Sequence, residues 1–169
     1  MHRFMSIQKT IAHSFNEIKS ILLQFDDDMY QKELKIISNG TIGQHFRHII
    51  EFYFCFIEAQ QNGCVCYDER KRNYLWETSV IESLNIINQL NDNFLQLDLT
   101  KKIKLKQNYY NDSFLIESTN QRELMYCFDH SIHHFAILKI ALTTTFPTVK
   151  IPTNFGIASS TLHFQKQEK

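Results

Sequence analysis

The segment TIGQHFRHII, residues 41–50, opens the part of the chain that decides its fold class. Apolar side chains recur there every three or four residues, and the pattern continues to Ile57. That spacing puts an apolar stripe on one face, as in an amphipathic helix packed on a core. We therefore predict a helix from about Thr41 to Gln61, ended by Gly63. The residues of the stripe are Ile42, Phe46, Ile49, Tyr53 and Ile57.

Three further segments show helical spacing of their apolar residues, over about residues 6–25, 77–97 and 118–145. The last of these begins with Ser118-Thr119-Asn120-Gln121, which matches a capping box. Each apolar stripe must be covered by another helix. We therefore predict an all-α fold in which residues 1–169 form a single domain, a four-helix bundle with long crossover connections.

Two other segments fit between and after the predicted helices. From residue 101 to 118 apolar side chains first alternate with lysines, and Tyr109-Tyr110-Asn111-Asp112 then reads as a turn. This pattern predicts a short β-hairpin or an extended crossover before the last bundle helix. The tail at residues 152–158 is apolar enough to pack back on the bundle.

The composition agrees with a helical protein and excludes several classes. Four Gly and two Pro disfavour β-sandwiches and Gly-rich nucleotide loops. Lys plus Arg equals Asp plus Glu, 18 each, so no overall field attracts nucleic acid or an anionic membrane. No apolar run approaches the roughly 18 residues of a membrane span, and Met1–Ser6 does not resemble a signal peptide. The four cysteines form no framework of spaced pairs, so we expect a cytoplasmic protein with reduced thiols.

Histidines are concentrated in two predicted helices. His45 and His48 lie on the second, and His130, His133 and His134 lie on the fourth. At about 100° per residue, His130 and His134 are about 40° apart and one turn apart along the helix. Helix-borne zinc pairs have this spacing. His133 points about 100° from His134, so it is a weaker candidate.

A chelating pair on one helix needs a third ligand, which the second helix offers as His45 or His48. The helical wheel alone favours His45, which is nearer the apolar stripe. Three imidazoles leave open positions on zinc, nickel or iron, as in catalytic sites. The competing interpretation is a surface pair or a buried pair of histidines with no metal.

At these residues the chain resembles the DinB-like superfamily, which includes YfiT-type metal-dependent hydrolases and bacterial thiol S-transferases. The resemblance rests on residues 41–50 and on residues 123–134, ELMYCFDHSIHH. Residues 67–69 and the tail at 154–162 look like the branch of this superfamily common in Bacteroidetes. The similarity covers nearly the whole chain in helix order. Its motifs are short, and only their joint pattern is specific.

The resemblance implies a site and an activity. It places one ligand on His48 and the pair on His130 and His134, so it replaces His45 by His48. It implies a divalent metal, a small-molecule substrate such as a thiol cofactor, and a homodimer. The alternative is a non-catalytic stress-response or binding protein on the same fold. A pocket open to solvent at the three imidazoles would favour the enzyme, and a site sealed by aromatic side chains would favour the structural role.

Other polar residues near the histidines have two interpretations each. Glu51 is a candidate general base, although we expect a solvated helix face instead. Arg47 could hold an acidic substrate, and we expect it to pair with an acid of a neighbouring helix. The basic run at residues 70–72 could hold an anionic thiol cofactor, and we expect a solvated loop. The closely spaced Cys64 and Cys66 could be redox-active or bind a soft metal, and neither role has further support.

Overall fold

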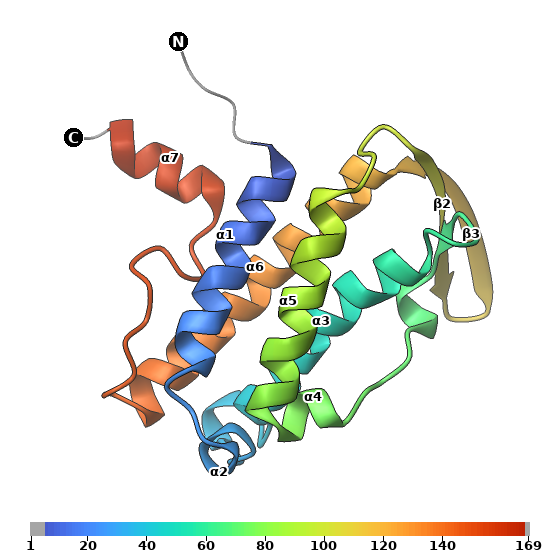
Figure 1. The fold of residues 1–169 in the computed structure, drawn as a ribbon. Coiled ribbons are helices and arrows are strands. Elements are labelled where there is room, and N and C mark those ends of the chain that lie inside the picture. The colour runs from blue at the N-terminus through green and yellow to red at the C-terminus, as the bar shows by residue number, and fades with distance from the viewer. Residues whose placement is uncertain (1–5, 168–169) are drawn as a thin grey trace.

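The computed structural model describes residues 6–167, which form a mostly helical fold with a small three-stranded sheet (Figure 1). Residues 1–5, on which the prediction of no signal peptide partly rests, lie outside the described residues. In chain order the elements are α1 (Ile7–Leu22), α2 (Asp27–Tyr30), the 3-10 helix η1 (Lys35–Ile37), α3 (Ile42–Glu58), β1 (Cys64–Val65), the 3-10 helix η2 (Tyr67–Glu69), α4 (Leu75–Thr78), α5 (Val80–Leu95), β2 (Lys102–Tyr109), β3 (Asp112–Thr119), α6 (Asn120–Thr145) and α7 (Ser159–Gln167).

The long helices α1, α3, α5 and α6 pack against one another around an aromatic core. Helices α1 and α3 each contact both α5 and α6. At the centre Tyr53 of α3 lies edge-on to Phe15 of α1, with ring centroids 5.0 Å apart, and 5.5 Å from Phe94 of α5. All three side chains are buried. Aromatic rings of this size bury large apolar areas, so these contacts stabilise the packing of the long helices.

Helix α3 begins as predicted at Thr41, whose hydroxyl accepts a hydrogen bond from the backbone N–H of Gln44, while the Gln44 side chain accepts one from the Thr41 N–H. This capping box satisfies two backbone donors at the start of the helix. One turn in, a Cβ at Gly43 would lie 2.1 Å from the backbone oxygen of Glu77. Glycine is therefore required for the close approach of α3 and α4.

The predicted third helix is divided in two, which corrects the expected single span over residues 77–97. Ser79 is extended, with φ −127°, and separates α4 from α5. The first N–H of α5, from Val80, donates to the Asp27 carboxylate at 2.8 Å. A residue distant in sequence thus caps α5, and the apolar periodicity gives no sign of it.

The capping box predicted from Ser118 is one residue out of place. Thr119 is the N-cap of α6 and accepts from the N–H of Arg122 at 3.2 Å, while Ser118 belongs to β3. The reason is that strand pairing extends through Thr119, which pairs with Lys102. The strand therefore runs directly into the helix.

The β-hairpin is confirmed: β2 and β3 pair antiparallel, and Tyr110 turns the chain with φ 52°. The short strand β1, which the sequence analysis did not predict, pairs parallel with β2 and places Cys64 opposite Lys104. This pairing fixes the loop that follows α3, including η2 and Arg70, beside the bundle.

The tail packs back on the bundle, as predicted. Phe155 is fully buried and stacks on Phe135 of α6 with ring centroids 4.4 Å apart. Gly156 follows with φ 70°, and a Cβ there would lie 2.7 Å from the backbone of Phe135 and Ala136. The short helix α7 after this turn was not predicted; in Figure 1 it lies near the start of α1.

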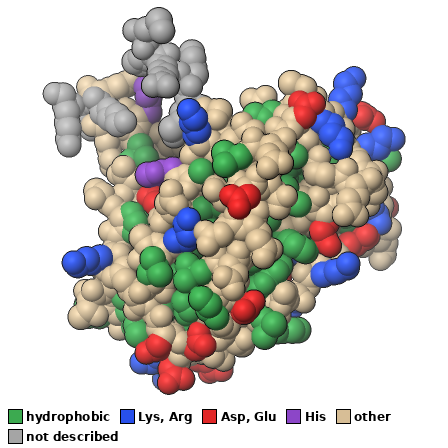
Figure 2. Space-filling view, in the orientation of Figure 1, with side chains coloured by type: hydrophobic (Ala, Val, Ile, Leu, Met, Phe, Trp, Pro, Cys, Tyr) green, Lys and Arg blue, Asp and Glu red, His purple; other side chains and the backbone are tan. Residues whose placement is uncertain are grey.

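Charged side chains of both signs are interspersed on the face that Figure 2 shows, which agrees with the zero formal net charge. Within residues 6–167, none of the helices combines the length and apolar character that crossing a membrane requires.

Candidate metal centre

His48 of α3 and His130 and His134 of α6 converge where these two helices pack together, and we call them the three-histidine cluster. One ring nitrogen from each lies within 4.8 Å of the other two. The Nε2 atoms of His48 and His130 are 2.9 Å apart. The predicted convergence of imidazoles from two separate segments is therefore confirmed.

The spacing and chemistry of the cluster fit a divalent metal ion. In a tetrahedral zinc site with Zn–N bonds of about 2.0–2.1 Å, ligand nitrogens lie about 3.3 Å apart. The 2.9 Å between His48 and His130 needs only a small separation of the two rings to reach this value. Imidazole nitrogen suits zinc, nickel and iron, and three such ligands leave coordination positions open.

The surroundings keep the three imidazoles neutral, which is the form that binds metal. Burial is the main cause in each case. It lowers the pKa of His48 and of His134 to about 3, helped by the mutual repulsion of the rings and by the charge of Arg70. Burial, with the charges of His133 and Arg70, lowers the pKa of His130 to about 4. At neutral pH each ring is therefore uncharged and carries one nitrogen lone pair, the form that can bind a metal.

His45 lies beside the cluster rather than in it. Its Nδ1 faces the Nδ1 of His134 at 3.2 Å, and the ring centroids are 5.4 Å apart. The wheel-based choice of His45 was wrong because the rotation of α3 against α6 is set by packing, which a straight wheel does not include. His133 is exposed and outside the cluster.

Glu51 is buried at 1% exposure, so the expectation of a solvated helix face was wrong. Its carboxylate lies 3.3 Å from Arg47 Nε and 3.4 Å from Arg70 Nε, and it accepts the backbone N–H of Asn73 at 3.0 Å. These contacts tie α3 to the loop that carries Arg70. They favour a structural role for Glu51 over that of a general base.

Arg47 pairs with Glu51 and with Glu77 of α4, as expected for a structural ion pair. Because Glu51 lies one turn along α3 and Glu77 lies on the neighbouring α4, the guanidinium is held between the two helices, next to His48. A role in binding an acidic substrate would require it to leave these partners.

The sequence analysis did not predict the contact of Arg70 with the three-histidine cluster. Arg70 was expected in a solvated loop, but its side chain is only 16% exposed. Its Nη2 lies 3.0 Å from His48 Nδ1, and its Nη1 donates to the backbone oxygen of Tyr67 at 2.9 Å. The guanidinium also lies over the ring of Phe52, 4.9 Å from its centroid. The unpredicted pairing of β1 with β2 and the contacts of Glu51 with Arg70 and Asn73 together hold this loop at the cluster.

The cluster is covered by aromatic side chains on one side and reaches solvent on another. Phe52 stacks on His130 with ring centroids 4.1 Å apart. A shallow cavity of about 220 Å³ opens beside His48 and His134 and is also lined by Gln44, His45 and Arg47. An open cavity at the imidazoles is the feature that we expected of an enzyme rather than of a sealed structural site.

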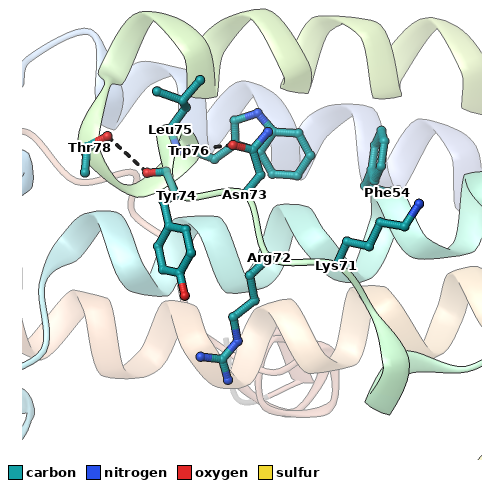
Figure 3. A pocket seen from close by; sticks show the side chains of 8 residues that line it. All are labelled: Phe54, Lys71, Arg72, Asn73, Tyr74, Leu75, Trp76 and Thr78. Carbon is teal, nitrogen blue, oxygen red and sulfur yellow. Dashed lines mark hydrogen bonds between the residues drawn. The ribbon is translucent and has the colours of Figure 1, made fainter.

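A larger cleft of about 540 Å³ lies along the loop that follows Arg70 (Figure 3). None of its lining residues belongs to the three-histidine cluster; they are Phe54, Lys71, Arg72, Asn73, Tyr74, Leu75, Trp76 and Thr78. Lys71 and Arg72 are exposed, so the solvated-loop expectation holds for these two members of the basic run. In Figure 3 the side chains of Arg72 and Tyr74 extend to the same side of the loop.

Comparison of the chain with protein-family models, with curated proteins and with solved structures gave no match. The three-histidine cluster is therefore the structural observation from which a function is argued.

Proposed function

We propose that this chain is a DinB-like four-helix-bundle protein that binds one divalent metal and acts as a metal-dependent hydrolase or thiol S-transferase. The observation that supports this most strongly is the convergence of three neutral imidazoles from α3 and α6 within 4.8 Å. A solvent-open cavity beside two of them supports a catalytic use of the site. The thiol substrate and a homodimer belong to the proposal through the family resemblance alone.

Each residue around the site has a role in this proposal. His48, His130 and His134 hold the metal, and His45 orients the ring of His134 through the Nδ1–Nδ1 contact of 3.2 Å. Hydrogen-bonded neighbours of this kind fix the ring orientation of metal-binding histidines. Phe52 covers the face of His130 and keeps water from that side. A bound divalent ion supplies Lewis acidity, which lowers the pKa of a thiol or of water in an open coordination position.

The cavity limits the substrate to a small group at the metal. Ligand pockets usually measure about 300–1,000 Å³, whereas this one measures about 220 Å³. We therefore expect the reacting end of the substrate to enter the cavity and the rest to lie on the surface.

Metal analysis and activity measurements test the proposal together. The purified protein should contain about one zinc, nickel or iron per chain and be active in a panel of thiol-transfer and hydrolytic reactions. His48→Ala should lose both metal and activity, while the matched control His133→Ala, at an exposed position, should keep both. Metal content that is absent from the wild type, or unchanged in His48→Ala, would refute the metal site. Metal binding without activity in any reaction would favour the non-catalytic alternative.

A further inference from the structure

We propose that the metal centre takes an anionic ligand and that Arg70 binds this anion after releasing His48. This inference rests on the proposed metal site and adds the charge of its ligand. It begins with the hydrogen bond between Arg70 and His48. A guanidinium has only donors, so the contact of 3.0 Å requires His48 Nδ1 to accept.

Metal binding removes that acceptor. A neutral imidazole has one N–H and one lone pair. With Arg70 as the donor, the lone pair of His48 lies on Nδ1 and the proton lies on Nε2, facing His130. When the metal takes the lone pair of His48, the other nitrogen must carry the proton. Whichever nitrogen binds, Nδ1 can no longer accept from Arg70.

Once His48 stops accepting, Nη2 of Arg70 has no other acceptor among the contacts found in residues 6–167. Arg70 Nη1 already donates to the Tyr67 carbonyl, and Nε faces Glu51 at 3.4 Å. For Nη2, His48 Nδ1 is the partner that the structure gives. A mostly buried guanidinium nitrogen without an acceptor is costly. A ligand that brings an acceptor to the metal centre would remove this cost.

The charge balance also favours an anion. Three neutral imidazoles leave both charges of a divalent ion uncompensated, and Arg70 adds a third positive charge beside them. Its Nη2 lies 3.0 Å from His48 Nδ1. Glu51, the carboxylate that Arg70 contacts, is shared with Arg47. An anion in the open position would compensate the metal and Arg70 together.

Azide binding to the Co²⁺-loaded protein tests this inference through the visible absorption of cobalt. In Arg70→Gln we expect azide to bind about tenfold or more weakly than in the wild type, since one charge-assisted contact is lost. The exposed Arg72→Gln is the matched control and should bind azide like the wild type. Neutral imidazole, used as a second probe, should bind equally to all three proteins. Co²⁺ affinity should not fall in Arg70→Gln, because the arginine no longer competes for His48.

The outcomes distinguish a failure of the metal site from a failure of the role of Arg70 in binding the anion. Equal azide affinity in the wild type and Arg70→Gln, or an equal loss of azide and imidazole binding, overturns the role of Arg70 and leaves the metal site intact. A wild type that binds no Co²⁺ refutes the metal site and this inference with it. If Arg70→Gln does not fold, Arg70→Lys keeps the charge but loses the planar fork. Azide affinity in that variant must then fall measurably, and an unchanged value overturns the inference.

Discussion

The Glu51→Gln variant tests whether the carboxylate of Glu51 stabilises the fold or acts as a general base. The Glu51 side chain is fully buried, and it faces Arg47 and Arg70 at 3.3 and 3.4 Å. Removing one partner of a buried ion pair costs about 3–5 kcal/mol, because an uncompensated charge stays behind. Arg47 keeps Glu77 as a partner, whereas Arg70 loses the carboxylate that pairs with it. We therefore expect a loss near the lower end, about 3 kcal/mol, in Glu51→Gln.

Urea denaturation of the metal-free protein measures this loss. With an m-value of about 2 kcal/mol/M, 3 kcal/mol corresponds to a fall of about 1.5 M in the midpoint. Glu58→Gln is the matched control, since Glu58 is on the same helix, 45% exposed and 3.9 Å from Lys71. It should change stability by less than about 0.5 kcal/mol. A Glu51→Gln protein as stable as this control would refute the structural role of Glu51. If that protein also lost activity while its stability was unchanged, Glu51 would again be a candidate general base.

Three further changes have outcomes that follow from the structure. Gly43→Ala should lower the free energy of unfolding by about 1–3 kcal/mol in chemical denaturation, because its Cβ would lie 2.1 Å from the backbone oxygen of Glu77; unchanged stability would contradict this close approach. Phe155→Ala should lower the free energy of unfolding by about 3–5 kcal/mol and lower the thermal midpoint, because the buried ring is lost. The control Phe164→Ala, at a side chain that is 59% exposed, should leave the midpoint unchanged. Equal midpoints in the two variants would show that the tail does not pack on α6. The metal-free protein should lose stability as the pH falls below 6.5, since unfolded histidines take up protons there while the folded cluster, with pKa values lowered to about 3 and about 4, does not. Urea midpoints at pH 7 and pH 5 measure this loss, which should be smaller in His134→Gln; an equal loss in both proteins would contradict the assignment.

The sequence predicted the parts of the fold that depend on local spacing. The apolar stripe of α3 and the i, i+4 pair of His130 and His134 are set by helical periodicity, so both were found without a structure. The helical wheel failed to choose between His45 and His48, because the rotation of one helix against another depends on the whole core. The family resemblance, which carries that packing implicitly, selected His48, the residue that the structure brings to the pair.

The errors have a common physical origin in contacts between distant segments. The break at Ser79 is stabilised by Asp27, which caps α5 from 53 residues away, while the apolar pattern runs through it undisturbed. Arg70 was assigned to a solvated loop because a basic run is usually solvated. Its loop is held by the parallel pairing of β1 and β2, a two-residue contact too short to show in periodicity. Glu51 was assigned to a solvated face for the same reason, since two of its partners, Arg70 and Asn73, lie on this loop.

X-ray absorption at the zinc K-edge of the zinc-loaded protein tests the metal centre most directly. The convergence of His48, His130 and His134 predicts three imidazole nitrogens at about 2.0–2.1 Å from one zinc per chain. His130→Ala should lose one of these ligands or the metal itself. A zinc ion surrounded by oxygen or sulfur ligands, or a spectrum unchanged in His130→Ala, would contradict the three-histidine site.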